Sequence, residues 1–239
     1  ASVEAFSFPA SYRLNQQLLM QTPGPLGRRS EPDIEGARLI IGGVLAEGRT
    51  QLSELESKAI LMAFGVPVVE TVEATTASQA LVVAESIGFP LVMKINSPDI
   101  THKTDVNGVR LNIQTAGAIR TTFNELIADV KAKRPDATIT GVTLQSMVRH
   151  PHGRETMVGV VRDPVFGPAI SFGAGGTTVE VMHDSFVSLP PLNRFIAGQT
   201  IERTRINRLL GAFRNMPPVN REALENVLLR VSELVCELP

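Results

Sequence analysis

The sequence predicts an α+β protein with two lobes, each built from a sheet and packed helices. Segments with helical periodicity alternate with short apolar runs that are typical of strands. The strands are short and hairpin-like, and their order along the chain is irregular. This pattern favours two α+β lobes over one doubly wound parallel sheet. A chain of 239 residues is long enough for one large domain or two small ones.

The composition narrows the class of protein. Apolar residues make up 43% and charged residues 20%, as in ordinary globular proteins. The net charge of -1 gives no electrostatic case for binding nucleic acid, and the apolar runs are too short to span a bilayer. The chain begins without a signal-like segment, and the lone Cys236 excludes an internal disulfide or a cysteine zinc site. We therefore expect a cytoplasmic protein that binds neither nucleic acid nor membranes.

Residues 1–48 are expected to form an N-terminal extension that includes a linker. The run at 21–30 is rich in Pro and Gly, which is typical of linkers. Residues 34–45 fit a short helix or a strand, and the pair Gly42-Gly43 argues against a long helix.

A capping box marks the start of the next helix. Ser53 is the predicted N-cap, Glu56 follows three residues later, and Gly65 closes the helix. The elements expected after it are a strand at 66–70, a helix at 76–87, strands at 90–95 and 109–113, a helix at 116–133, strands at 142–148, 156–162 and 169–172, a further segment at 179–181, and helices at 206–213 and 221–236.

The stretch of residues 89–112 contains the polar and charged residues that suggest a binding site. Lys94 lies in an apolar strand, where an ammonium group is costly unless an anion meets it. A turn follows, and then a polar loop with His102 and Lys103 before the next strand begins. A lysine and a polar loop held between two strands suit a phosphorylated ligand.

Two ordered blocks carry a resemblance to a known family. SPDITHKTDVNGV and VGVVRDPVFGPAISFGAGGTTVEVMHD resemble the ATP-grasp part of NDP-forming acyl-CoA synthetases. These enzymes interconvert acyl-CoA, ADP and phosphate with acid, CoA and ATP. LPPLNRFIAGQTIERTRINRLL resembles more closely a branch in which this region is fused to a GNAT protein lysine acetyltransferase. The resemblance implies an ATP-grasp fold, with a small lobe at 49–145 and a large lobe at 146–239 that is incomplete at its C-terminal end.

The resemblance also implies roles for residues of the 89–112 stretch. It places Lys94 on the phosphates of the nucleotide, although a lysine at a strand end commonly snorkels to solvent. It makes His102 the acceptor of a phosphoryl group, a role that suits a nucleophilic, largely neutral imidazole. Without the resemblance, a histidine in a polar loop is usually a solvated surface residue. Lys103 would steady the phosphate.

The remaining cofactor-binding candidates come from the later block and from the expected hinge. They are Met147 and Val148 at the hinge, Glu155 before a strand, and Gly173, Gly175 and Gly176 in a glycine-rich loop. Glycines let backbone N–H groups approach an anion closely, but this loop fits neither the Walker nor the dinucleotide pattern. Without the resemblance, the hinge residues would be interpreted as an interior strand and Glu155 as an ordinary surface acid.

Two functions follow from the resemblance. The first is the ATP- and ADP-binding portion of an ADP-forming acyl-CoA synthetase-like protein that transfers a phosphoryl group through His102 and works with a CoA-binding domain of the same parent. The alternative is a non-catalytic region of a GNAT-fused acetyltransferase that senses acyl-CoA or nucleotide. PLNRFIAG motivates the alternative, as does Asn107, which replaces the first of two glycines usual in the family.

No metal ligand is assigned within the chain. In this family, the acid and its partner that hold Mg²⁺ are expected after the final helix, beyond residue 239, so we expect the isolated chain to be inactive. A self-association module is a third possibility, but no sequence feature points to it.

Overall fold

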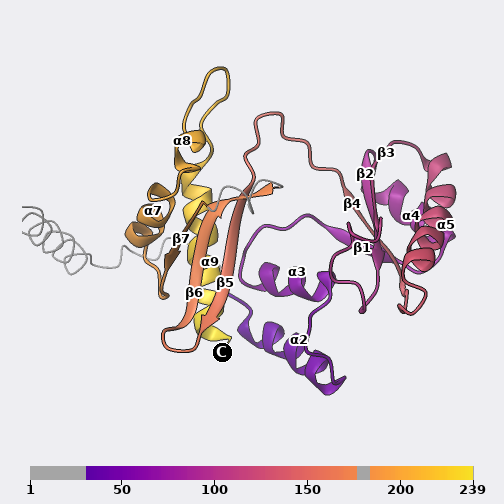
Figure 1. Ribbon diagram of the computed structural model, residues 1–239, viewed down its shortest axis with the longest axis horizontal. Helices are drawn as coiled ribbons and strands as arrows, with labels where there is room; N and C mark the ends of the chain where they lie inside the picture. The colour runs from indigo at the N-terminus through magenta and orange to yellow at the C-terminus, as the bar shows by residue number, and fades with distance from the viewer. Residues whose placement is uncertain (1–30, 177–183, 239) are drawn as a thin grey trace, which may run out of the picture.

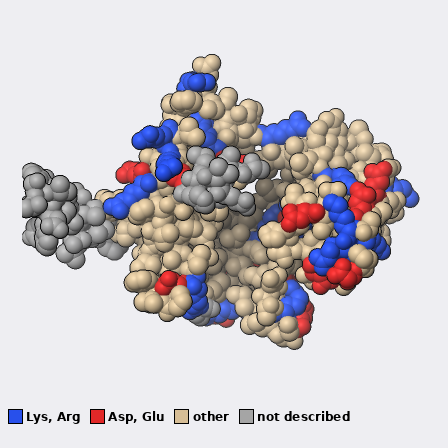
Figure 2. Space-filling view, viewed as in Figure 1, with Lys and Arg blue, Asp and Glu red and all other residues tan. Residues whose placement is uncertain are grey.

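The protein has two lobes, each with its own antiparallel sheet, as the sequence predicts. The computed structural model describes residues 31–176 and 184–238. One sheet has four strands in the order β1-β4-β2-β3 and the other has three in the order β5-β6-β7. The two sheets lie at opposite sides of the molecule (Figure 1), and the surface is hollowed between them (Figure 2).

The elements follow in a mixed order along the chain. They are α2 (Ile34–Ala46), α3 (Glu54–Ala63), β1 (Thr71–Ala74), α4 (Ala77–Ile87), β2 (Leu91–Asn96), β3 (Val109–Ile113), α5 (Ala116–Lys133), β4 (Gly141–Ser146), β5 (Thr156–Asp163), β6 (Gly167–Ala174), β7 (Ser185–Ser188), α7 (Arg194–Glu202), α8 (Asn207–Leu210) and α9 (Arg221–Glu237).

The four-stranded sheet buries only one of its faces in the core of its lobe. Alternate residues Leu91, Met93 and Ile95 of β2 pack with residues of α4 and α5, because neighbouring side chains of a strand point to opposite faces. Lys94 therefore lies on the other face, directly opposite Thr143 of β4. This second face, which we call the polar face of the first sheet, is the one that α3 approaches.

The three-stranded sheet packs on the C-terminal helices. Ile170 and Phe172 of β6 are fully buried in a core shared with Leu228 of α9 and Ile201 of α7. Figure 1 shows α9 running behind this sheet and α7 beside β7. The second lobe thus has a core separate from that of the first.

Helix α3 lies between the lobes. Ile60 and Phe64 are buried with Ala37 of α2, and Leu234 and Leu238 of the C-terminal segment pack against them. The body of α3 is therefore anchored next to α9, while Figure 1 shows it extending toward the first sheet. Its position allows side chains of its first turns to reach across to that sheet.

The predicted start signal at Ser53 and the helix end at Gly88 are confirmed. Ser53 and Glu56 form both hydrogen bonds of a capping box. Thr76 caps α4 with its side chain, and Gly88 ends that helix at φ +86°, a left-handed conformation that glycine adopts without strain. The helices expected at 116–133 and 221–236 also form.

In the N-terminal half, the strand predicted at 66–70 is wrong, and the helix alternative for residues 34–45 is confirmed. Residues 66–70 are not a strand: Val66 packs into the core of the second lobe, Pro67 has no N–H to donate, and pairing with β4 begins only at Thr71. Residues 34–46 form one helix of 13 residues that runs through Gly42 and Gly43. Its burial of Ala37 and Val44 offsets the low helix propensity of the glycines.

The C-terminal half contains elements that the sequence did not predict. Strand β7 and helix α7 were missed, and the helix expected at 206–213 is only Asn207–Leu210. The segment expected at 179–181 lies outside the described residues, as do Glu180 and His183. Among the described residues, none of the helices is long and apolar enough to cross a membrane.

Candidate functional site

The polar face of the first sheet holds a cluster of three lysines around one carboxylate. Lys94 Nζ lies 2.8 Å from Glu54 Oε1, and Lys58 Nζ lies 3.3 Å from the same oxygen. Lys103 Nζ lies 3.2 Å from the other oxygen, Oε2. We call these four residues the lysine cluster. It brings together two of the sequence-predicted site residues, Lys94 and Lys103.

The members of the cluster come from three separate elements. Lys94 projects from the polar face of β2, and Lys103 belongs to the loop between β2 and β3. Glu54 is the first residue of α3, and Lys58 lies one turn later on the same side of the helix. The capping box at Ser53 fixes where α3 begins, and thereby where the Glu54 carboxylate lies.

Gln145 connects the cluster to the neighbouring strands. Its side-chain oxygen accepts hydrogen bonds from Lys94 at 3.0 Å and from Lys58 at 3.2 Å. Lys58 also donates to the hydroxyl of Thr71 on β1. The cluster is therefore held by three neighbouring strands, since β4 lies between β1 and β2.

The cluster is partly shielded from solvent and carries excess positive charge. The four side chains are between 16% and 23% exposed. Three ammonium groups and one carboxylate leave a net charge of +2 (3 − 1). Burial acts to raise the pKa of Glu54, but hydrogen bonds and charges from Lys94 and Lys103 outweigh it and lower the pKa from 4.5 to about 2. An anion with two negative charges would balance this site.

Thr143 places an unpaired hydroxyl on the same face. It lies directly opposite Lys94 and is 1% exposed. Its Oγ1 has no hydrogen-bond partner within the described part of the chain. Buried hydroxyls are usually paired because an unpaired one costs free energy, so Thr143 is an unsatisfied polar group next to Lys94.

The loop that carries His102 is tied down on both sides of it. The side chain of Asp99 accepts a hydrogen bond from Thr138 N at 2.7 Å, and Ile100 is buried in the core of the first lobe. After the histidine, Gly108 N donates to Lys103 O at 2.7 Å. The loop thus has fixed ends, while the His102 side chain is exposed.

Asn107 and Gly108 complete this loop without the usual glycine pair. Asn107 adopts φ +57°, a left-handed conformation that asparagine tolerates, so the turn survives the substitution. A Cβ on Gly108 would lie 2.6 Å from Ile95 Cγ2 and 2.7 Å from Lys103 O. Glycine is therefore required only at the second of these two positions.

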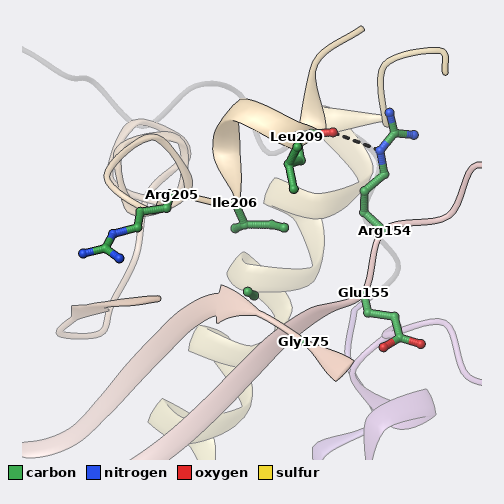
Figure 3. A pocket seen from close by; sticks show the side chains of 7 residues that line it. Arg154, Glu155, Gly175, Arg205, Ile206 and Leu209 are labelled. Atoms are coloured by element: carbon green, nitrogen blue, oxygen red, sulfur yellow. Dashed lines mark hydrogen bonds between the residues drawn. The ribbon is translucent and has the colours of Figure 1, made fainter. Parts of the chain in front are cut away.

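Glu155 and the three candidate glycines lie where β5 begins and β6 ends. Arg154, Glu155 and Gly175 line a cavity of about 320 Å³ with Ile206 and Leu209. Figure 3 shows Arg154 bonded to the Leu209 carbonyl and the Glu155 carboxylate pointing away from Ile206 and Leu209. Neither Lys94 nor His102 lines this cavity.

The glycines of this region have a packing role. A Cβ on Gly173 would lie 1.8 Å from Asp184 O, where β7 begins, and one on Gly175 would lie 2.8 Å from the backbone of Thr156. Gly176 has φ +78°, and its Cβ would meet Glu155 Oε2 at 2.1 Å. The close approach of neighbouring backbone explains Gly173 and Gly175 without a ligand, and the positive φ explains Gly176. Their contact with a nucleotide stays a prediction.

The expected hinge residues leave the first sheet. Strand β4 ends at Ser146, so Met147 and Val148 lie in the connection to β5 and not in an interior strand. Met147 N donates to Pro90 O at 3.0 Å, and Val148 is 52% exposed.

A groove of about 670 Å³ lies between α3 and residues 65–71, and Lys58 and Thr71 are among the residues that line it.

The described residues contain no group of three His, Cys, Asp or Glu side chains that could hold a metal ion. Asp184 has a structural role, because its carboxylate accepts hydrogen bonds from Arg205 N and Ile206 N, both at 2.6 Å. The expectation that magnesium ligands lie outside this sequence stays a prediction.

Sequence reasoning missed Glu54, Lys58 and Thr143. A Glu and a Lys four residues apart on a helix are common surface residues, and nothing in their spacing points to a lysine 40 residues later. The alternation of β4 offered one signal, because it puts Thr143 and Gln145 on the face opposite the buried Val142 and Leu144.

Comparison with known proteins places the chain in a family. The family model for the ATP-grasp domain matches residues 43–239. The chain belongs to the ATP-grasp family. It is 40% identical to the β subunit of an ADP-forming acetate–CoA ligase from Pyrococcus furiosus, over 85% of this chain and 86% of that protein. It is 38% identical to an ADP-forming acetate–CoA ligase of Archaeoglobus fulgidus, over 86% of this chain but only 29% of that longer protein.

Solved structures support the same ATP-grasp assignment. An acetyl-coenzyme A synthetase from Candidatus Korarchaeum cryptofilum, in complex with coenzyme A and Ca-AMPCP, has a TM-score of 0.81 and 35% identity, with 84% of this chain and 87% of that chain covered. Another structure of that synthetase contains Mg-AMPPCP and has a phosphohistidine segment pointing towards the nucleotide binding site. Its TM-score is 0.73 and its identity 31%, with 84% and 86% of the two chains covered. The predicted ATP-grasp fold is confirmed.

Proposed function

We propose that this chain is the nucleotide-binding portion of an ADP-forming acyl-CoA synthetase, and that it transfers a phosphoryl group through His102. The observation that carries the proposal is the lysine cluster, with a net charge of +2, which joins β2 and α3 to the loop that bears His102. The ligase relatives and the nucleotide-bound Korarchaeum structures support it.

In this proposal, Lys94 and Lys103 bind the terminal phosphates of ATP or ADP. Ammonium groups in a partly shielded site neutralise phosphate charge more effectively than they would in water. Lys94 projects from a strand and so provides a fixed charge. Lys103 follows His102 directly in the loop, and we assign the phosphate that Lys103 binds as the one that His102 receives.

The transfer step exchanges one bond to phosphorus for another. An imidazole nitrogen of His102 attacks the γ-phosphorus of ATP, an N–P bond forms, and the bond to the bridging oxygen breaks with release of ADP. The reverse step makes ATP from ADP and phosphohistidine. Magnesium would shield the phosphate charge when bound, and no step is assigned to it.

The rest of the reaction requires a partner, which we propose to be a CoA-binding domain. The Pyrococcus relative is named a β subunit, and the Archaeoglobus relative is a longer single chain. Within this chain, we propose a small lobe at 49–145 and a large lobe at 146–239. Met147 and Val148 would lie near the base of the nucleotide, and Glu155 and the glycines Gly173, Gly175 and Gly176 would face it from the large lobe.

A regulatory role in a GNAT-fused acetyltransferase has less support. Asn193 of the PLNRFIAG segment caps α7 through a hydrogen bond to Ile196 N, and Leu192 is buried in the core of the second lobe. These structural roles account for both residues, and the relatives described above are ligases.

Labelling with phosphate tests the proposed function. The longest natural chain that contains this sequence is incubated with Mg²⁺ and ATP carrying ³²P at the γ position. We expect an acid-labile, alkali-stable label on the wild type, loss of that label in His102→Asn, and retention in His152→Asn, which replaces another exposed histidine. An equal label on the His102→Asn variant would exclude His102 as the acceptor.

A further inference from the structure

Glu54 lies between the two lysines to which the proposed function assigns the phosphates. One of its oxygens contacts Lys94 at 2.8 Å and the other contacts Lys103 at 3.2 Å. The carboxylate thus bridges a lysine on a strand and a lysine in a loop. Among the described residues, the two ion pairs with Glu54 connect the side chains of Lys94 and Lys103.

The donors of the three ammonium groups are used unequally. Lys58 donates hydrogen bonds to Thr71 and Gln145 and forms an ion pair with Glu54 at 3.3 Å, so three protein groups surround its ammonium group. Lys94 contacts Glu54 and Gln145, which leaves one donor. Lys103 contacts Glu54 and keeps two. Within the described part of the chain, Lys94 and Lys103 therefore offer three donors (1 + 2), while three protein groups contact Lys58.

Glu54 belongs to a helix that is capped and packed against the rest of the molecule. It is the first residue of α3, whose start is fixed by the Ser53 capping box. The same helix buries Ile60 and Phe64 against α2 and the C-terminal segment. Lys103, in contrast, lies in a loop. Contact with Glu54 therefore transmits the fixed position of α3 to the loop that carries His102.

We propose that Glu54 and Lys58 are positioning residues for phosphate binding: Glu54 sets the spacing of the Lys94 and Lys103 ammonium groups, and Lys58 holds Glu54 and Gln145 in place. The inference rests on the proposed function. It assigns Lys58 a role that differs from that of the other two lysines, because three protein groups contact its ammonium group.

The opposite role for Glu54 is that of a competitor that occupies the place of the phosphate. Both roles use the same ion pairs, but they predict opposite changes in the affinity for polyphosphate when Glu54 is removed. A competitor reduces affinity, so its removal would strengthen the binding of polyphosphate. A positioning residue increases affinity, so its removal weakens binding even though the net charge of the cluster rises from +2 to +3. The positioning role is favoured because the cluster retains three unused donors and a charge of +2 with Glu54 in place.

Calorimetric titration distinguishes the two roles. ATP and inorganic tripolyphosphate are titrated separately, at one ionic strength, into the wild type, Glu54→Gln, Lys58→Met and Lys131→Met. We expect Glu54→Gln to weaken both ligands about tenfold and Lys58→Met to weaken them about threefold to tenfold, each tenfold change corresponding to about 1.4 kcal/mol. Lys131 is an exposed lysine on α5, and its loss should change neither affinity by more than about twofold by the same conversion.

A second measurement separates positioning from loss of folding. Thermal unfolding identifies any variant that is not folded at the titration temperature, and Lys58→Met tests the inference if Glu54→Gln does not fold. Unchanged or tighter binding by folded Glu54→Gln and Lys58→Met would overturn the inference. If the wild type binds tripolyphosphate but not ATP, the nucleotide assignment fails while the positioning role is still decided by tripolyphosphate. If the wild type binds neither, both fail.

Discussion

Thr143 shows at the scale of a single residue how the polar face departs from a well-packed interior. Its hydroxyl is buried opposite Lys94 with no partner among the described residues. An unpaired buried hydroxyl costs about 1–3 kcal/mol. A valine of nearly the same shape would avoid this cost, so retaining threonine reduces the stability of the free protein and keeps a polar group beside the lysines.

We expect Thr143→Val to raise the free energy of unfolding of the free protein by roughly 1 kcal/mol, measured by urea denaturation followed by circular dichroism. Thr200→Val is the matched control. Thr200 is also fully buried, but its hydroxyl bonds to Ser188 and to Ile196 O at 2.7 Å. The control should therefore be destabilised, because it leaves these partners unpaired. Equal destabilisation of both variants would contradict the argument.

Single residues of the site were predictable from sequence only where the residue type was unusual for its place. Lys94 in an apolar strand and Lys103 in a polar loop are of this kind, and both lie in the cluster. Glu54 and Lys58 are ordinary in a helix. Glu54 contacts Lys94, 40 residues later, and Lys58 contacts Thr71 and Gln145, 13 and 87 residues later. No local sequence pattern contains these contacts.

Elements were predictable where their ends carry a chemical signal. Ser53 and Gly88 mark helix ends, and those ends were placed correctly. The apolar run at 66–70 has no such signal, and tertiary packing made it an extended connection instead of a strand. Helix α7 did have a signal, the N-cap Asn193, but the proline-rich run before it reads as a loop. Short strands such as β7 depend on pairing with a neighbour and are not visible locally.

The junction of β6 and β7 depends on a close approach of two backbones. Ala174 N donates to Asp184 O at 3.1 Å, and a Cβ on Gly173 would lie 1.8 Å from that oxygen. We expect Gly173→Ala to lower the free energy of unfolding by about 1–3 kcal/mol, as overpacking does. The midpoint of urea denaturation measures this effect.

Gly43→Ala is the control for this substitution. Gly43 lies within α2 and a Cβ there would meet nothing within 4 Å. Alanine should raise the free energy of unfolding by about 0.5–1 kcal/mol, because glycine is a poor helix former. If both glycines tolerated alanine equally, the packing explanation for Gly173 would be wrong.

At the scale of the whole molecule, the lysine cluster links two separate cores. Glu54 belongs to a helix packed beside α9, while Lys94 belongs to the first sheet. The pKa of Glu54 is lowered from 4.5 to about 2 in the folded protein. The folded state therefore binds fewer protons than the unfolded state between these values, so the contribution of Glu54 to stability is complete above pH 4.5 and is lost as the pH falls toward 2.

We expect the free energy of unfolding to fall by on the order of 2 kcal/mol more in the wild type than in Glu54→Gln when the pH is lowered from 5 to 2.5. At pH 7, Glu54→Gln should be the less stable protein, because three lysines then face one another without a carboxylate. Urea denaturation at a series of pH values measures both effects. Glu85→Gln, an exposed acid on α4, should keep the wild-type pH dependence. Parallel curves for the wild type and Glu54→Gln would mean that the carboxylate does not couple α3 to the first sheet.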